Sequence, residues 1–291
     1  MKTVLCLLVF LFCLYGGFSL AEEARCLEGN CITGKGVMLY EDGARYSGEF
    51  KDSMRAGYGT LISADGKRYE GEWAEDEKNG QGTLKTPNDE KYTGEFKDGV
   101  KQGQGIYTFA NGEVYTGNFK NGEPDGRGVH TYPDGGKYEG EFKNSLYEGN
   151  GTLVLPDGRK YVGEFSQGKA EGNGILTLAN GEKYIGEFAE AKGNGKGKYI
   201  FSDGTTYEGD WKDFAYHGQG TITFADGSRY EGQFQSGKIE GYGTMTSPSG
   251  ETYKGNWKEN MRHGYGVLTT ADGKKIEGQW QQDKFMGDAS Q

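Results

Sequence analysis

The sequence has little of what a compact domain normally uses to build a core. Leu, Ile, Val and Phe together make up 49 of its 291 residues. So low an aliphatic share, combined with a net charge of −10, is typical of disordered chains. Only five residues are proline, which excludes a proline-rich linker, and no Gly-X-Y run is present, which excludes collagen. No segment has helical periodicity of useful length, which argues against a helical or doubly wound domain.

Glycine and aromatic residues are abundant instead. The chain has 53 Gly, 20 Tyr, 15 Phe and 4 Trp residues. Disordered chains are poor in aromatic residues, so the composition gives contradictory indications until the positions of these residues are considered.

The first 21 residues have the organisation of a secretory signal peptide. Lys2 precedes the uncharged segment Val4–Leu20, and the small residues Ser19 and Ala21 occupy the −3 and −1 positions of a cleavage site. We therefore expect cleavage after Ala21 and export to the periplasm, the cell surface or the medium. The alternative is an uncleaved membrane anchor, for which the apolar stretch is short.

Cleavage would leave Cys26 and Cys31 as the remaining cysteines. A pair five residues apart in an exported protein predicts a local disulfide, which we place in an N-terminal cap over residues 22–33. A metal site is disfavoured because two ligands are too few and no histidine lies nearby. Two free thiols are the third alternative.

An internal repeat accounts for most of the glycines. The pattern Tyr-x-Gly-x-(Phe/Trp) recurs at steps of 23 residues without insertion or deletion, and a Gly-x-Gly pair keeps the same step from Gly34 to Gly266. An Asp-Gly or Asn-Gly dipeptide follows most of these pairs. The pattern begins at Tyr46, Tyr69, Tyr92, Tyr115, Tyr138, Tyr161, Tyr184, Tyr207, Tyr230 and Tyr253, with Ile276 in the eleventh Tyr position.

Each unit predicts a β-hairpin. Tyr, Gly and Trp alternate with Glu over residues 68–73, so one face of that strand is aromatic and the other charged. A polar turn such as residues 97–101 and a second strand such as residues 220–224 follow, and the Asp-Gly or Asn-Gly dipeptide is expected to supply the positive φ angles of a tight hairpin turn. Short connections require an antiparallel meander.

Glycine inside a strand lets a neighbouring ring lie on the backbone, so we expect the Tyr and Phe/Trp rows to cover the glycine rows of adjacent repeats. Two strands per unit, about 4.8 Å apart, predict a sheet on the order of 100 Å long. The fold class is therefore all-β: an elongated, single-layer, twisted antiparallel meander of stacked hairpins.

The repeating unit resembles the MORN (membrane occupation and recognition nexus) repeat over residues 34–287, with residues 288–291 left as a tail. Residues 207–220, with Tyr-Glu-Gly-Asp-Trp and a later His-Gly-Gln-Gly, are close to the ideal unit. Ile276, Asp89 and Lys198 depart from it. The resemblance implies a binding or scaffolding role, usually through protein contacts and in some members through proposed lipid contacts.

The residues that catalysis would need are missing, so we expect no enzyme activity and no cofactor. The sequence has three histidines, His130, His217 and His263. His217 and His263 occupy the same position two repeats apart, which is too far for them to share a proton or a metal. The Gly-x-Gly pairs precede no helix and so are not phosphate loops. Carboxylates stack before the Phe/Trp position, but at about 10 Å they are too widely spaced for a glycosidase pair. They are Glu49, Glu72, Glu95, Glu141, Glu164, Glu187 and Asp210.

We therefore expect an exported, non-catalytic scaffold that binds proteins. A lipid-surface binder is opposed by the net negative charge, which also disfavours nucleic acid. A glycan or cell-wall binder would need several exposed rings. Open strand edges at the ends of the array would favour a homodimer. Candidate surface contacts, in or near the turns, are Tyr58, Tyr147, Phe214, Tyr216, Tyr242 and Tyr265.

Overall fold

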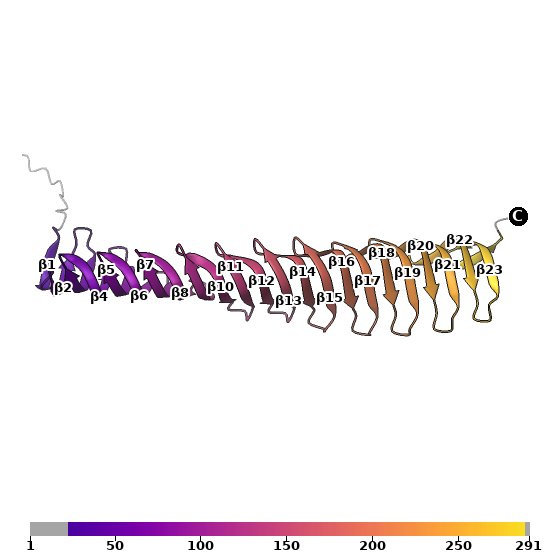
Figure 1. Ribbon diagram of the computed structural model, residues 1–291, viewed down its shortest axis with the longest axis horizontal. Helices are drawn as coiled ribbons and strands as arrows, with labels where there is room; N and C mark the ends of the chain where they lie inside the picture. Colours follow the sequence, from indigo (N-terminus) through magenta and orange to yellow (C-terminus); the bar gives the residue numbers. More distant parts are fainter. Residues whose placement is uncertain (1–22, 289–291) are drawn as a thin grey trace, which may run out of the picture.

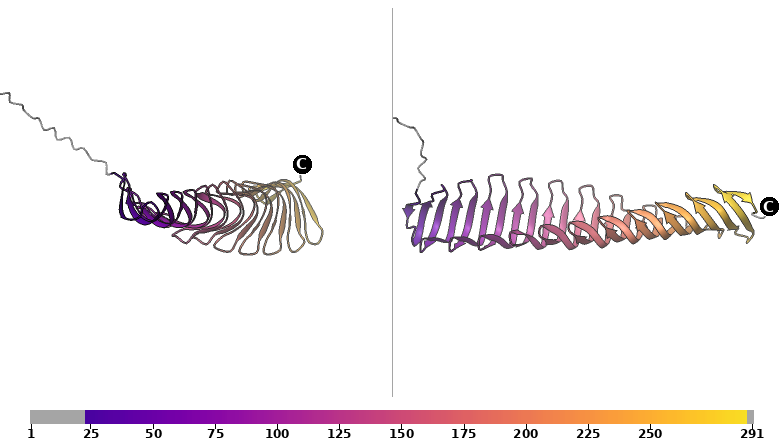
Figure 2. Two further views of the ribbon diagram at one scale, coloured as in Figure 1. Left: turned by 60° about the vertical axis from the view of Figure 1, so that its left-hand side comes forward. Right: turned by 90° about the horizontal axis from the view of Figure 1, so that it is seen from above.

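The described part of the chain, residues 23–288, forms one open β-sheet in the computed structural model (Figure 1). This part contains 24 strands, each antiparallel to the next in the chain, and no helix, so none that could cross a membrane. The sheet is elongated and turns about its long axis, and its strands are bowed (Figure 2). The predicted all-β meander of hairpins is confirmed. The predicted signal segment lies outside the described residues.

The strands follow one another at nearly constant spacing along the chain. They are β1 (Arg25–Gly29), β2 (Gly34–Leu39), β3 (Arg45–Lys51), β4 (Met54–Ile62), β5 (Arg68–Ala74), β6 (Glu77–Lys85), β7 (Lys91–Lys97), β8 (Val100–Thr108), β9 (Val114–Lys120), β10 (Glu123–Thr131), β11 (Lys137–Lys143), β12 (Leu146–Val154), β13 (Lys160–Ser166), β14 (Lys169–Thr177), β15 (Lys183–Ala189), β16 (Lys192–Ile200), β17 (Thr206–Lys212), β18 (Ala215–Thr223), β19 (Arg229–Gln235), β20 (Lys238–Thr246), β21 (Thr252–Lys258), β22 (Met261–Thr269), β23 (Lys275–Gln281) and β24 (Lys284–Gly287).

The two long sides of the sheet use different turns. On one side two residues with positive φ, such as Asp98 (49°) and Gly99 (77°), make the tight turn. On the other side the Phe109 N–H donates to the Glu113 carbonyl at 2.9 Å, and only Gly112 between them has a positive φ, of 86°. The repeated Asp-Gly or Asn-Gly dipeptide therefore lies in a three-residue loop with one positive φ. The predicted hairpin turn is present at this dipeptide, where the Gly112 N–H donates to the Phe109 carbonyl at 3.0 Å. The dipeptide supplies one positive φ angle, and the turn with two such angles is in the polar segment.

The glycine rows exist because tyrosine rings occupy their side-chain space. Gly71 and Gly82 pair across β5 and β6, and the ring of Tyr69 lies over both. A Cβ atom added to Gly82 would lie 2.5 Å from the ring carbon Cε2, and the Tyr69 hydroxyl donates to the Glu72 carbonyl at 2.9 Å. Each Tyr ring therefore covers the glycines of its own repeat, not of the neighbouring repeat as predicted. The Trp row does reach the preceding repeat, since the Trp73 indole N–H donates to the Gly59 carbonyl at 3.2 Å. We call this side the aromatic face and the other side the polar face.

The rings also join successive repeats. Tyr92 meets Phe96 of its own repeat and Phe119 of the next in edge-to-face contacts, with centroids 5.0 and 4.9 Å apart. These contacts continue without a break from Tyr46 to Trp280 and make a ring ladder. Each such pair contributes about 0.5–1.5 kcal/mol beyond its buried area. The ladder is the core that the few aliphatic residues cannot supply.

A disulfide begins the ladder at the N-terminal end. Cys26 on β1 is joined to Cys31 in the turn that follows, with Cα atoms 5.9 Å apart. A Cβ atom added to Gly36 on β2 would lie 2.8 Å from the Cys31 sulfur. Sulfur therefore covers the first glycine, as a tyrosine ring does in later repeats.

Candidate functional site

Three of the six predicted contact residues lie on the polar face. Tyr58, Tyr242 and Tyr265 are exposed by 56%, 50% and 43% of their surface. The Tyr58 hydroxyl donates to the Glu70 carboxylate at 3.3 Å, and that of Tyr265 donates to Glu277. Tyr58 lies on β4 and the other two on β20 and β22, near opposite ends of the sheet. The three rings therefore do not form one patch.

The other three lie on the aromatic face. Tyr147 stacks on Tyr138 and Tyr216 stacks on Tyr207, with centroids 3.6 and 3.9 Å apart. Burial raises the pKa of Tyr216 to about 12. Phe214, in contrast, is 40% exposed. Tyr147 and Tyr216 thus cover the ladder, and Phe214 presents its ring to solvent.

Tyr147 and Tyr216 belong to a row of residues that lie over the ladder, one per repeat. We call this row the cover slot. Its members are Arg55, Lys78, Lys101, Pro124, Tyr147, Ala170, Gly193, Tyr216, Ile239, Arg262 and Phe285.

Cations fill the cover slot near both ends of the sheet. The Arg55 guanidinium lies 4.3 Å from the centre of the Trp73 ring, and that of Arg262 lies 4.5 Å from Trp280. The Lys101 ammonium lies 4.2 Å from the centre of the Tyr107 ring, and burial lowers its pKa. Positive charge over an aromatic ring is stabilised by the ring quadrupole. From Pro124 to Ile239 the slot holds no charged residue.

A second row follows the same division. It opens the three-residue loops, begins with the aromatic Tyr40, and is polar at Ser63, Thr86, Ser247 and Thr270. Between Thr86 and Ser247 the row is apolar or aromatic and half-buried over six consecutive repeats. We call these residues the central tract: Phe109, Tyr132, Leu155, Leu178, Phe201 and Phe224.

The central tract borders a hollow on the aromatic face. The hollow has a volume of about 530 Å³ and is bounded on one side by Leu178 and Phe201 of the tract together with Tyr199. Phe214 and Tyr216 bound it on the other side. A volume of several hundred cubic ångströms is typical of ligand sites, and this one is lined almost wholly by apolar and aromatic residues.

His130 lies on the aromatic face, in a polar network. Its Nδ1 atom is 3.3 Å from the Tyr147 hydroxyl, which also shares a hydrogen bond with the Tyr132 hydroxyl. Its Nε2 atom lies 3.0 Å from the Glu113 carboxylate, near enough for an ion pair but outside hydrogen-bond geometry. Burial raises the pKa of Tyr147. Within residues 23–288 no cluster of His, Cys, Asp and Glu could hold a metal ion.

The sequence model of the MORN repeat family matches the chain eleven times in succession. The matches cover residues 32–45, 46–68, 69–90, 92–114, 115–137, 138–158, 161–183, 184–206, 207–229, 230–252 and 253–275. The chain belongs to the MORN repeat family. The unit that begins at Ile276 lies beyond the last match.

The solved structures that match this MORN-repeat chain resemble it only weakly. The TCP10 domain of Danio rerio CPAP, in complex with a peptide of Danio rerio STIL, is 13% identical over 89% of this chain and 100% of that one, with a TM-score of 0.25. Virginiamycin B lyase from Staphylococcus aureus is 13% identical over 89% and 88%, with a TM-score of 0.15. Both scores are too low to support a shared fold. No curated protein matches the chain.

The carboxylate row has a structural role in each MORN repeat. The Glu72 carboxylate accepts a hydrogen bond from the backbone N–H of Gln81 at 3.1 Å, where the strand pairing of β5 and β6 shifts by a bulge. Asp210 accepts from Gln219 in the same way at 2.8 Å. Where Asn118 replaces the acid, its amide donates to a backbone carbonyl instead. The row stabilises the bulges.

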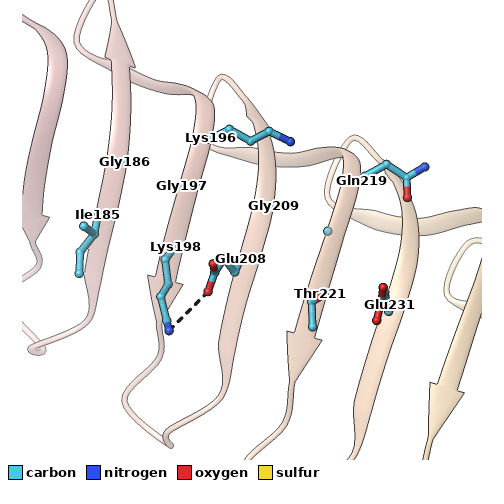
Figure 3. Close-up of a pocket in the computed structure, with 11 residues that line it drawn as sticks. Ile185, Gly186, Lys196, Gly197, Lys198, Glu208, Gly209, Gln219, Thr221 and Glu231 are labelled. Atoms are coloured by element: carbon cyan, nitrogen blue, oxygen red, sulfur yellow. Dashed lines mark ion pairs between the residues drawn. The ribbon is translucent and has the colours of Figure 1, made fainter.

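The polar face of the MORN sheet has a shallow groove beside this carboxylate row. Figure 3 shows Lys196 and Gln219 on one side of it and the ion pair of Lys198 with Glu208 on the other. Backbone of paired glycines such as Gly197 and Gly209 forms its floor. A main-chain floor between charged side chains gives little chemical selectivity.

The cover slot and the central tract were missed by reasoning from sequence. The MORN motif draws attention to its constant positions, whereas both rows consist of positions that vary from repeat to repeat. Reading every 23rd residue from Arg55 to Arg262, and again from Ser63 to Thr270, shows the change from charged or polar outer repeats to an apolar centre. Phe285 and Tyr40, at the ends of the two rows, depart from this trend. That signal was present in the sequence.

Proposed function

We propose that this MORN-repeat chain is a non-catalytic scaffold that holds protein partners on the aromatic face of its sheet. The observation that carries the proposal is the central tract with the uncharged part of the cover slot. Together they give an apolar surface over about six repeats, or roughly 60 Å at two strands per repeat. A contiguous apolar surface of this size is a mark of protein contact in a soluble protein.

The absence of catalysis is part of the proposal. The carboxylates that stack along the sheet are occupied with backbone amides, as at Glu72 and Asp210. His130 lies against Glu113 and Tyr147, in a network with no nucleophile beside it. These groups support the fold, so we expect none of them to act as a general base.

Export is also proposed. The segment 1–21 has the organisation of a cleaved signal, and the disulfide between Cys26 and Cys31 suits an oxidising compartment. We expect the protein to act in the periplasm, on the cell surface or in the medium.

The alternatives have weaker support. A net charge of −10 opposes binding to anionic lipids. The exposed tyrosines that could stack on a glycan are separated on the polar face. A homodimer through the terminal strands is favoured by exposed Leu27 and Ile32 at one end and Phe285 and Met286 at the other.

Binding by the exported full chain to protein extracts, to anionic vesicles and to polysaccharide tests these possibilities side by side. We expect a saturable protein partner whose cross-links fall on the aromatic face. Binding to anionic vesicles alone would overturn the proposal. Sedimentation of the same sample tests the homodimer, which a strictly monomeric rod would exclude.

A further inference from the structure

Two residues break the pattern of the repeat at the hollow beside the central tract: Phe214, which lines it, and Gly193, which lies behind the Phe214 ring. Gly193 is the only glycine among the described cover-slot residues. Phe214 is the only bulky side chain in the second position of the tight turns, where the other repeats have Gly, Ala, Ser, Asn or Asp. The two exceptions touch: a Cβ atom added to Gly193 would lie 2.8 Å from the Phe214 ring.

Phe214 is held in an unfavourable conformation. Its φ of 60° is in the left-handed region, which a bulky side chain rarely adopts. The ring packs edge-on against Tyr184 and Phe188, with centroids 5.5 and 6.0 Å away. Glycine serves at the corresponding position 237 in the next repeat. The turn therefore does not need phenylalanine, and a residue that breaks a local rule in this way often marks a functional site.

We propose that the hollow is an anchor pocket for one large apolar side chain from a basic segment of a protein partner. This inference rests on the proposed function and specifies one contact within it. The lining of Leu176, Leu178, Phe201 and Trp211 suits Phe, Trp or Leu. A deep aromatic-lined pocket that buries one anchor is the usual form of an interface hot spot.

The charge at the rim selects a basic segment. The Glu182 carboxylate accepts a hydrogen bond from the Tyr199 hydroxyl at 2.6 Å and another from Ser202, but has no cationic partner in the described chain. Next to Phe214 in the chain, Asp213 is paired with Lys192 at 3.1 Å, so these two charges neutralise each other. A lysine or arginine beside the anchor would pair with Glu182. Because the Tyr199 hydroxyl is already engaged, a sugar would find few free polar groups.

Short fluorescent peptides test the pocket directly. They carry a central Phe, Leu or Ala between two lysines or two glutamates, and their binding to the full chain is followed by anisotropy. We expect the lysine peptides with Phe or Leu to bind at least about tenfold more tightly than the Ala peptide, because the anchor is buried. They should also bind more tightly than the glutamate peptides.

Phe214→Gly removes one wall and the unfavourable φ together. We expect it to weaken the Phe peptide at least about tenfold while the melting temperature stays equal or rises. Ala191→Gly is the matched control, since it makes the same change at the same turn position one repeat earlier, outside the hollow. It should leave binding unchanged. Glu182→Gln keeps an acceptor for Tyr199 and should remove the preference for lysine over glutamate.

Each result has a definite meaning. Equal binding of the Phe and Ala peptides, or normal binding by Phe214→Gly, overturns the anchor pocket. If a protein partner still cross-links to the aromatic face of Phe214→Gly, the scaffold proposal survives that failure. Binding of neutral phosphatidylcholine vesicles that is lost in Phe214→Gly would assign the hollow to an acyl chain and overturn the peptide ligand.

Discussion

The N-terminal repeats and the central repeats have the same ladder under different covers. Tyr69 and Tyr161 each lie over a glycine pair and donate a hydrogen bond to a backbone carbonyl at 2.9 Å. Above Tyr69 lies the ammonium of Lys78, whereas the corresponding residue above Tyr161 is Ala170. The layer that holds the sheet together is constant, and the layer that meets solvent changes.

This separation explains how a thin sheet can combine stability with a specific surface. Each ladder ring contacts only its own repeat and its neighbours, so stability is roughly a sum of local terms. Cover residues can then differ from repeat to repeat without changing these local contributions of the ladder. The ladder rings are buried in both regions, while the cover over them is charged in the outer repeats and uncharged in the central repeats.

The shared ladder predicts a single transition at alkaline pH, the largest effect we expect. Burial raises the pKa of Tyr138 and Tyr184 from the model-compound value of 10.0 to about 12. Between these values the unfolded chain binds fewer protons, so the free energy of unfolding falls as the pH rises. The contribution is complete below pH 10 and is lost through pH 12. Tyrosinate absorbance and circular dichroism should change together.

Salt provides the control for that experiment. At high pH the chain also gains negative charge, and charge repulsion is screened by salt whereas the burial of a tyrosine is not. The transition should therefore stay in place when salt is added. Two separate transitions, one for each region, would contradict a common ladder.

Substitution of a row glycine by alanine should be equally destabilising in both regions. A Cβ atom at Gly82 or at Gly174 would lie 2.5 Å from a ring carbon of Tyr69 or Tyr161. Gly82→Ala and Gly174→Ala should each lower the free energy of unfolding by about 1–3 kcal/mol or more, because the ring has no room to move. Denaturant unfolding measures both. A large loss at one position and none at the other would show that the ladder differs between regions.

Gly204→Asn is a suitable control for those variants. Gly204 has a φ of 90° and nothing within 4 Å of its added Cβ atom. Asparagine tolerates the left-handed region, so a loss well below that of the ladder variants is expected.

The constant layer was largely predictable from the sequence, and the variable layer was not. Tyr46 and Trp73 repeat at fixed positions, so their burial over glycine followed from alternation in a strand. The three-residue loop at Gly112 was missed because the Asn-Gly dipeptide fits two kinds of turn. Phe214 meets Gly193, 21 residues away, through a backbone hydrogen bond that recurs between equivalent residues of other repeats. The motif alone does not show which residues face each other there, because that depends on the register of the turn.

The two ends of the sheet should respond differently to reductant. Cys31 covers Gly36 at the N-terminal end, whereas the last strand, β24, has no cross-link. Reduction should lower the free energy of unfolding by about 2 kcal/mol, as expected for closing a short loop. Hydrogen exchange should show the loss concentrated in β1 and β2. An unchanged melting temperature in reductant would remove the proposed role of the disulfide as a cap.

Exchanging cover-slot residues between the outer and central repeats tests whether the cover varies independently of the ladder. Of the changes considered, it should have the smallest effect on stability. Lys101→Ala should cost about 0.5–1 kcal/mol, because the ammonium loses its contact with the Tyr107 ring. Ala170→Lys places the same charge over the central rings and should change the free energy of unfolding by no more than that amount. Its effect should appear in binding, since a partner on the central tract would have to desolvate the new ammonium. Partner capture that is weakened by Ala170→Lys and unaffected by Lys101→Ala would separate the two layers, whereas equal capture by both variants would place the contact elsewhere.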